Sequence, residues 1–246
     1  MVLALLADIH SNLEALQGCL AHAHARGAKR FAFLGDLVGY GPDPGAVVDI
    51  VAQYASRGAV VVQGNHDAAA CGAVSYLNDA AARSIEWSRG MLSPAQGDFL
   101  RGLPLCVREE ALCFVHASAV APDRWEYIDS PAAAQRSAQA AGTAYTFCGH
   151  VHVPELFGQG AGDRMIAFKP RPGIAIPAGM NRAWLAIVGS VGQPRDGNPA
   201  ACYALVDLEA KNMTFYRVAY DHQATARKVR AAGLSESLAY RLERGG

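Results

Sequence analysis

Carboxylate, imidazole and amide side chains recur directly after short apolar runs of this sequence. In the segment FCGHVHVP, residues 147–154, two histidines stand one residue apart, although the chain has only 8 histidines in 246 residues. Side chains of these types also occur in ADIH, GDLVGYG, GNHD and ALCFVH. The complete set is Asp8, His10, Asp36, Asn65, His116, His150 and His152.

These seven side chains are all of types that bind metal ions. Seven donors are too many for one tetrahedral zinc with an open position. They suit two divalent ions that share a carboxylate and lie roughly 3.5–4 Å apart. Imidazole with carboxylate favours transition metals, and manganese, iron, zinc and nickel stay open as alternatives. No cysteine belongs to the set, which disfavours a purely structural zinc site.

The charge of such a centre indicates its substrate. Two divalent ions bring four positive charges, and Asp8, Asp36 and a bridging hydroxide together remove three of them. The remaining positive charge favours an anion. A phosphate ester fits, because its oxygens bind the ions while the hydroxide attacks phosphorus in line.

Short strands are predicted to carry these side chains. Val2–Ala7, Arg30–Leu34 and Ala59–Val62 are apolar runs of strand length, with a helix capped by Ser11 and a helix over Pro44–Tyr54 between them. Strand–helix alternation predicts parallel pairing. The polar clusters then meet outside the carboxyl ends of the strands, where open α/β sheets bind ligands.

Spacing within the clusters predicts where their side chains point. Asp8 and His10 are two residues apart, as are His150 and His152. On an extended segment, residues two apart point the same way, so each pair is expected to face one site. Gly35, Gly64 and Gly149 precede clusters and are expected to permit tight turns and close backbone approach.

The second half of the chain has a different pattern, with short strand-like runs separated by turn residues. The predicted strands are Pro104–Arg108, Ala111–His116, Ala144–Cys148, Glu155–Gly158, Ala183–Val188, Ala201–Leu208 and Asn212–Ala219. The predicted helices are Asn78–Arg89, Pro94–Gly102, Asp221–Ala232 and Ser235–Arg244. A mixed or antiparallel sheet follows, and we expect residues 1–246 to form a single domain with two packed sheets.

Composition limits the partners. Hydrophobic residues make up 51%, charged residues 18%, and the formal net charge is zero, which favours a globular protein without stable binding to nucleic acid or membranes. Six cysteines without a C-x-x-C pair indicate reduced thiols and a cytoplasmic location. We expect neither a signal peptide nor a transmembrane segment. A homo-oligomer stays open.

Five blocks in order, DIH, GDLVGYG, GNHD, VH and GHVH, resemble the calcineurin-like metallophosphoesterase superfamily from Asp8 to His152. The segment GSVGQPRDG, residues 189–197, resembles a bacterial and archaeal branch of phosphodiesterases and dinucleoside polyphosphate hydrolases. The resemblance implies an α/β fold, a four-layer α/β/β/α sandwich. It also implies an enzyme that hydrolyses a small phosphodiester, a nucleotide or a dinucleoside polyphosphate. A phosphomonoesterase and a non-catalytic scaffold are the alternatives.

The resemblance also implies a role for each residue. Asp36 would bridge the two metals, with Asp8, His10 and His152 completing one of them. The other would be bound by Asp36, Asn65, His116 and His150. His66 would stabilise the transition state or protonate the leaving group, and Asp67 would orient it.

The chain departs from the superfamily's protein phosphatases at one motif. Gly39, Tyr40 and Gly41 stand where those phosphatases have Asp-Arg-Gly, which disfavours a phosphoprotein substrate. Tyr40 is expected to stack on a base or line the pocket. The segment Arg164–Arg195 has five cationic residues and no acidic one. It is either a solvated surface or a lip for a polyphosphate, with Arg195 the best candidate for contact.

Overall fold

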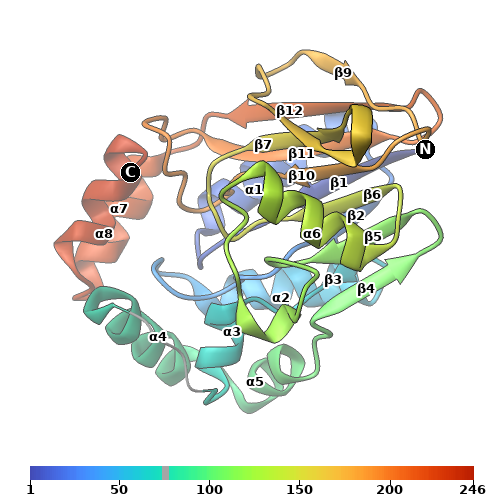
Figure 1. The fold of residues 1–246 in the computed structure, drawn as a ribbon. Helices are drawn as coiled ribbons and strands as arrows, with labels where there is room; N and C mark the ends of the chain where they lie inside the picture. The colour runs from blue at the N-terminus through green and yellow to red at the C-terminus, as the bar shows by residue number, and fades with distance from the viewer. Residues whose placement is uncertain (74–77) are drawn as a thin grey trace.

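Two six-stranded sheets pack face to face in the computed structural model, which describes residues 1–73 and 78–246 (Figure 1). In the first sheet the strand order is β3-β2-β1-β11-β12-β9. Its strands are β1 (Val2–Leu6), β2 (Arg30–Phe33), β3 (Val60–Val61), β9 (Ala175–Pro177), β11 (Ala201–Asp207) and β12 (Asn212–Val218). The three N-terminal strands pair in parallel, as predicted.

The second sheet is mixed, with strand order β4-β5-β6-β10-β7-β8. Its strands are β4 (Cys106–Glu109), β5 (Leu112–Val115), β6 (Tyr145–Cys148), β7 (Glu155–Gln159), β8 (Met165–Phe168) and β10 (Trp184–Ile187). Its middle strands β5, β6 and β10 are parallel to one another, and β10 pairs with β7 antiparallel.

Helices lie on the outer faces of the two sheets and beside them. They are α1 (Leu13–Ala25), α2 (Pro44–Ala55), α3 (Asn65–Ala70), α4 (Asp79–Met91), α5 (Pro94–Arg101), α6 (Pro131–Ala141), α7 (His222–Ala231) and α8 (Glu236–Arg244), with short 3-10 helices at Pro122–Arg124 and Ala161–Asp163. Helices α1, α2 and α5 pack on the first sheet and α6 on the second. The predicted α/β/β/α order of layers is confirmed.

Side chains of β1 point alternately into the two apolar cores on either side of the first sheet. Leu3 and Leu5 lie in the core between the sheets, whereas Ala4 and Leu6 pack against the helices of the first sheet. All four side chains are fully buried. A strand buried on both faces reads as a continuous apolar run, which is the pattern of residues 2–7.

The C-terminal helices form a separate cluster beside the sheets. Helices α7 and α8 lie next to α4 (Figure 1), and their apolar side chains pack with α4 around Tyr40. This cluster connects the end of the chain with the GDLVGYG segment.

Some sequence-based expectations were wrong in detail. The N-cap of α1 is Asn12, whose side chain accepts from the Ala15 amide, and not Ser11. Helices α3 and α6 and strands β8 and β9 were missed. Strands β11 and β12 join the first sheet, where β11 pairs with β1, a long-range pairing that local patterns do not specify.

Two further expectations concern the whole chain. The six cysteines are free thiols, and four of them are buried. Within residues 1–73 and 78–246, the structure contains no helix with the length and apolar character needed to cross a bilayer.

Candidate metal centre and active site

The seven predicted metal ligands gather at one edge of the two sheets. They follow β1, β2, β3, β5 and β6, whose carboxyl ends point to that edge because the strands are parallel within each sheet. All seven are buried, with at most 8% of any side chain exposed. They are Asp8, His10, Asp36, Asn65, His116, His150 and His152.

One group of four can surround a single ion. Asp8, His10, Asp36 and His152 each offer a ligand atom, and these atoms lie within 4.8 Å of one another. The Nε2 atoms of His10 and His152 are 3.1 Å apart. His10 Nε2 lies 3.6 Å from the Asp36 carboxylate, and His152 Nε2 lies 3.7 Å from the Asp8 carboxylate.

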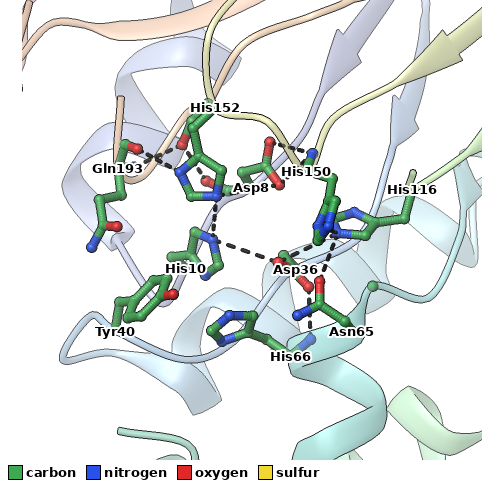
Figure 2. A network of polar contacts seen from close by, with 12 residues as sticks. Asp8, His10, Asp36, Tyr40, Asn65, His66, His116, His150, His152 and Gln193 are labelled. Atoms are coloured by element: carbon green, nitrogen blue, oxygen red, sulfur yellow. Dashed lines mark hydrogen bonds and ion pairs between the residues drawn. The ribbon is translucent and has the colours of Figure 1, made fainter. Parts of the chain in front are cut away.

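A second group shares Asp36 with the first. Ligand atoms of Asp36, His116 and His150 also lie within 4.8 Å of one another. His116 Nε2 is 3.4 Å from the Asp36 carboxylate, 3.1 Å from His150 Nδ1 and 3.1 Å from the Asn65 side-chain oxygen. Figure 2 shows Asp36 between the two groups.

Backbone carbonyls determine which histidine nitrogens are free for a metal. Nδ1 of His10 donates to Val38 O at 3.1 Å, and Nδ1 of His152 donates to Gln193 O at 2.6 Å. In the neutral rings the two Nε2 atoms therefore face each other with lone pairs. Two acceptors at 3.1 Å beside a carboxylate require a cation or a proton, so this donor set fits a divalent metal.

His116 has the same arrangement in the second group. Its Nδ1 donates to Leu34 O at 2.7 Å, which leaves Nε2 directed at Asp36, Asn65 and His150. Burial alone would lower the pKa of His116, but the charge of Asp36, its hydrogen bond to the ring and the charge of Asp8 together outweigh burial and raise the pKa to about 9. A proton on His116 thus supplies positive charge to the metal-free centre. Burial lowers the pKa of His150 to about 3, which keeps that ring neutral and able to bind a cation.

The backbone at the ligands is left-handed. Asp8, His10, Asp36, His150 and His152 have φ between 47° and 68°, a region that non-glycine residues rarely occupy. The expectation of extended segments was therefore wrong, although each pair does point into one site. Strain of this kind persists only where the surrounding structure enforces it, and it clusters at functional sites.

Two glycines allow the ligand loops to approach each other. A Cβ on Gly64 would lie 2.2 Å from the Asp36 amide nitrogen and from its Oδ1. A Cβ on Gly149 would lie 2.5 Å from Ala7 Cβ and 2.8 Å from Asp8 Oδ2. At these positions a side chain would displace the two carboxylates, which agrees with the predicted close approach.

His66 lies beside the first group of ligands. Its amide donates to Asp36 Oδ1 at 2.8 Å, and its ring centroid is 4.8 Å from that of His10 and 4.5 Å from that of Tyr40. The ring is buried, and its Nδ1 has no hydrogen-bond partner among the described residues. This imidazole therefore lies next to the candidate metal ligands with one ring nitrogen free of hydrogen bonds to the described residues.

Asp67 does not hold the His66 ring, so the predicted orienting role needs correction. Its Oδ1 accepts from the amides of Leu37 and Val38 at 2.8 and 3.2 Å, and its Oδ2 accepts from the Gly64 amide at 2.9 Å. The carboxylate connects the loop after β2 with the start of α3. It positions His66 through the backbone and not through the ring.

A cavity of about 610 Å³ opens onto these side chains. Tyr40 lines it, as predicted, and its hydroxyl lies 3.5 Å from Nη2 of Arg195, which also lines the cavity. The remaining lining residues are Asp36, Asn65, His66, Asn78, Ala81, Asp123, Arg124, Trp125, Tyr127, His150, His152, Arg241 and Gly246. The other cations of the basic segment, Arg164, Lys169, Arg171 and Arg182, are exposed and lie outside the lining.

Three lining residues were missed as candidates. Tyr127 stacks on the His150 ring at 4.2 Å, with 55% of the tyrosine exposed, and Trp125 meets His116 edge-on at 5.8 Å. Arg241 comes from α8, more than 200 residues after Asp8 in the sequence. The sequence signal WEY, residues 125–127, was available for the aromatic pair, whereas a single arginine in a charged helix gave none.

The model of the calcineurin-like phosphoesterase superfamily domain matches residues 1–211. The chain belongs to the calcineurin-like phosphoesterase superfamily. As a calcineurin-like phosphoesterase it is a metal-dependent hydrolase of phosphate esters. The two aspartate–histidine groups at the strand ends are therefore its candidate metal-binding residues.

Relatives extend over the whole length of this calcineurin-like phosphoesterase. An uncharacterized protein of Methanocaldococcus jannaschii is 32% identical, over 98% of this chain and 97% of the relative. The crystal structure of a metallophosphoesterase from Sphaerobacter thermophilus has 34% identity and a TM-score of 0.89, covering 100% of this chain and 99% of that one. A hypothetical protein from Pyrococcus horikoshii OT3, at 19% identity and a TM-score of 0.80 over 100% and 98% of the two chains, shares the fold.

Proposed function

We propose that the protein hydrolyses a small phosphodiester, a nucleotide or a dinucleoside polyphosphate, using two divalent transition-metal ions. One observation carries the proposal, namely two groups of ligand atoms that meet at Asp36. In the proposed centre, Asp8, His10, Asp36 and His152 hold one ion. Asp36, Asn65, His116 and His150 hold the other.

Bound divalent ions would supply Lewis acidity toward the phosphoryl oxygens and a nucleophilic water at neutral pH. The protein itself orients the ligand side chains. The backbone carbonyls of Leu34, Val38 and Gln193 orient three of the imidazoles. His66 would donate a proton to the leaving oxygen or a hydrogen bond to the charge that develops there.

The cavity supports a nucleotide-like substrate. Its volume of about 610 Å³ is in the range of small-molecule sites. Tyr127 and Trp125 present aromatic surface beside His150 and His116, on which a base can stack. Tyr40 lies at the position of the phosphatases' arginine and is buried against His10 and His66, which supports a substrate other than a phosphoprotein.

A substrate panel tests the proposal. We would assay an aryl phosphomonoester, bis(p-nitrophenyl) phosphate, cyclic nucleotides and dinucleoside polyphosphates, each with manganese, nickel, zinc and magnesium. We expect turnover of the diesters or polyphosphates with at least one transition metal. Hydrolysis of monoesters alone would replace the proposal with a phosphatase, and turnover of none of them would favour the scaffold.

A further inference from the structure

Two arginines, Arg195 and Arg241, line the cavity beside the candidate metal centre. Resting on the proposed function, we propose that Arg195 and Arg241 together bind a second phosphate group of the substrate. The helix α8 would thereby select substrates with two or more phosphates over those with one.

Arg195 has no acidic partner among residues 1–73 and 78–246. Its Nη2 contacts the Tyr40 hydroxyl at 3.5 Å and the Gln193 side-chain oxygen at 3.3 Å, which are both neutral oxygens. Its Nε is buried without a hydrogen-bond partner in the part of the chain that the structure describes. A buried, unsatisfied guanidinium nitrogen at a cavity wall is a donor available to a ligand.

Arg241 is also unpaired, although its helix has acidic residues. Arg230 of α7 forms ion pairs with both Glu236 and Glu243 of α8, at N–O distances of 2.6 and 2.7 Å. Arg241 forms no ion pair or side-chain hydrogen bond with any described residue, and it lines the cavity while half-buried. Arg195 and Tyr40 line the same cavity, so both guanidinium groups border one ligand-sized space.

The two arginines are connected through the backbone. The Gly197 amide donates to Gly245 O at 2.8 Å, which joins the segment after Arg195 to the end of α8. A Cβ on Gly245 would lie 2.4–2.8 Å from backbone atoms of Asn198, so the two segments are in close contact. The distance between the two arginines is therefore set by segments that are in contact and not by two independent loops.

Charge explains why a second anion is the expected ligand. Two guanidinium groups that line one cavity add positive charge to it, and the planar fork of arginine matches phosphate oxygens. The first phosphate would be at the metal ligands. Helices α7 and α8 lie outside residues 1–211, the part matched by the family model, whereas Arg195 lies inside it.

Arg241→Met tests the site by comparing substrates that differ in phosphate number. We would measure kcat/KM for a dinucleoside polyphosphate, for a cyclic nucleotide and for bis(p-nitrophenyl) phosphate. The loss for the polyphosphate is expected to exceed the loss for either single-phosphate substrate by roughly tenfold, since charge-assisted hydrogen bonds are removed from that substrate only. The excess should appear mainly in KM. Equal losses on all three substrates, or no loss, would overturn the inference.

Arg244→Met is the matched control. Arg244 lies in the same last turn of α8, stacks on Tyr240 and does not line the cavity, so its loss has the same effect on the helix without removing a cavity donor. If Arg241→Met has a lower Tm than this control, Arg241→Lys is used to test the site. Lysine keeps the charge but not the planar fork, so kcat/KM should fall less than in Arg241→Met and still fall more for the polyphosphate than for the single-phosphate substrates. If wild-type protein hydrolyses none of the substrates, the proposed function fails first. If it hydrolyses bis(p-nitrophenyl) phosphate and the variants are unselective, only the second site fails.

Discussion

Asp36 is the residue at which the two candidate ligand groups meet. One of its oxygens accepts from the His66 amide, while the other faces His10 and His116 at 3.6 and 3.4 Å. Although burial alone would raise the pKa of Asp36, the nearby charge of His116 and of the other imidazoles holds it well below its usual value. The carboxylate is therefore ionised and available to a cation from two sides.

Asp36→Asn should remove metal and activity together. An amide cannot neutralise two cations, so bound metal is expected to fall from two ions per chain to one or none, and kcat to fall on the order of 10³-fold or more. Elemental analysis measures the bound metal per chain, and hydrolysis of bis(p-nitrophenyl) phosphate measures kcat. Asp129→Asn, an exposed carboxylate outside the cavity lining, is the control. A variant with two metals and near-normal turnover would exclude the bridged centre.

His66→Ala should separate metal binding from turnover. Among the described residues, the ring belongs to neither group of candidate ligands and its Nδ1 has no hydrogen-bond partner, so metal content and unfolding temperature should change little. Loss of a proton donor at the leaving group lowers kcat by about 10²–10⁴-fold. His22→Ala, on the first helix, is the matched control. Unchanged kcat in the His66 variant would show that the ring has no part in the reaction.

Loops at the ends of elements carry the site, and hydrogen bonds between elements hold those loops. The His150 amide donates to both oxygens of Asp8 at 3.0 Å, which connects the end of β1 in one sheet with the end of β6 in the other. Asp67 connects the loop after β2 with α3. The arrangement explains how five left-handed residues are kept in place.

Asp67→Asn should destabilise the protein before it affects chemistry. The substitution replaces one of the two carboxyl oxygens that accept from three backbone amides by an NH2 group, which cannot accept, and lowers the free energy of unfolding by about 2 kcal/mol. Urea unfolding of the metal-free protein measures it, with Asp129→Asn as the control. A large loss of kcat at unchanged stability would indicate instead that Asp67 acts on the reaction directly.

Gly245→Ala tests the contact between the end of α8 and the loop that contains Arg195. Gly245 has φ of 78° and no room for a Cβ, whereas Gly233, at the end of α7, has φ of 70° and nothing within 4 Å. Both alanine variants carry the backbone strain, about 1 kcal/mol, but only Gly245→Ala also displaces the helix end. We therefore expect KM for polyphosphates to rise in Gly245→Ala alone. Identical behaviour of the two variants would contradict this view of the contact.

At the scale of the whole molecule, the two sheets bring both halves of the site together. The first sheet provides Asp8, His10, Asp36 and Asn65, and the second provides His116, His150 and His152. Their packed inner faces, with Leu3, Leu5 and Phe147 fully buried, determine how far apart these side chains lie. Metal binding and the cohesion of the sheets are therefore coupled.

Removing metal should lower the stability of the whole fold. A ligand at 100 times its dissociation constant adds about 2.7 kcal/mol to the folded state, which for a chain of this size corresponds to roughly 5–10 °C in Tm. Calorimetry of chelator-treated and manganese-loaded protein measures the shift. Asp36→Asn should show little of it. An identical Tm with and without metal in the wild type would argue against binding at these buried side chains.

The sequence by itself indicated which side chains gather at the candidate site, and its resemblance to the family implied the order of the layers. Asp8, Asp36, Asn65, His116 and His150 each follow an apolar run, and that local pattern is sufficient to predict a strand end with a polar cluster. Tyr40 was a candidate because of the family resemblance, and Arg195 because its segment is rich in cations; both line the cavity. Such features depend on neighbours in the chain, so periodicity and residue type reveal them.

Only the tertiary structure decided the rest. The insertion of β11 beside β1, the left-handed backbone at the ligands, the role of Asp67 as a backbone acceptor and the arrival of Arg241 in the cavity all depend on contacts between distant segments. The free energy of those contacts comes from packing and from hydrogen bonds formed across the fold. A residue's neighbours in the sequence do not indicate these long-range contacts. From the sequence alone, Arg241 is therefore one of several charged residues on a surface helix, and only the position of α8 in the fold places it at the cavity.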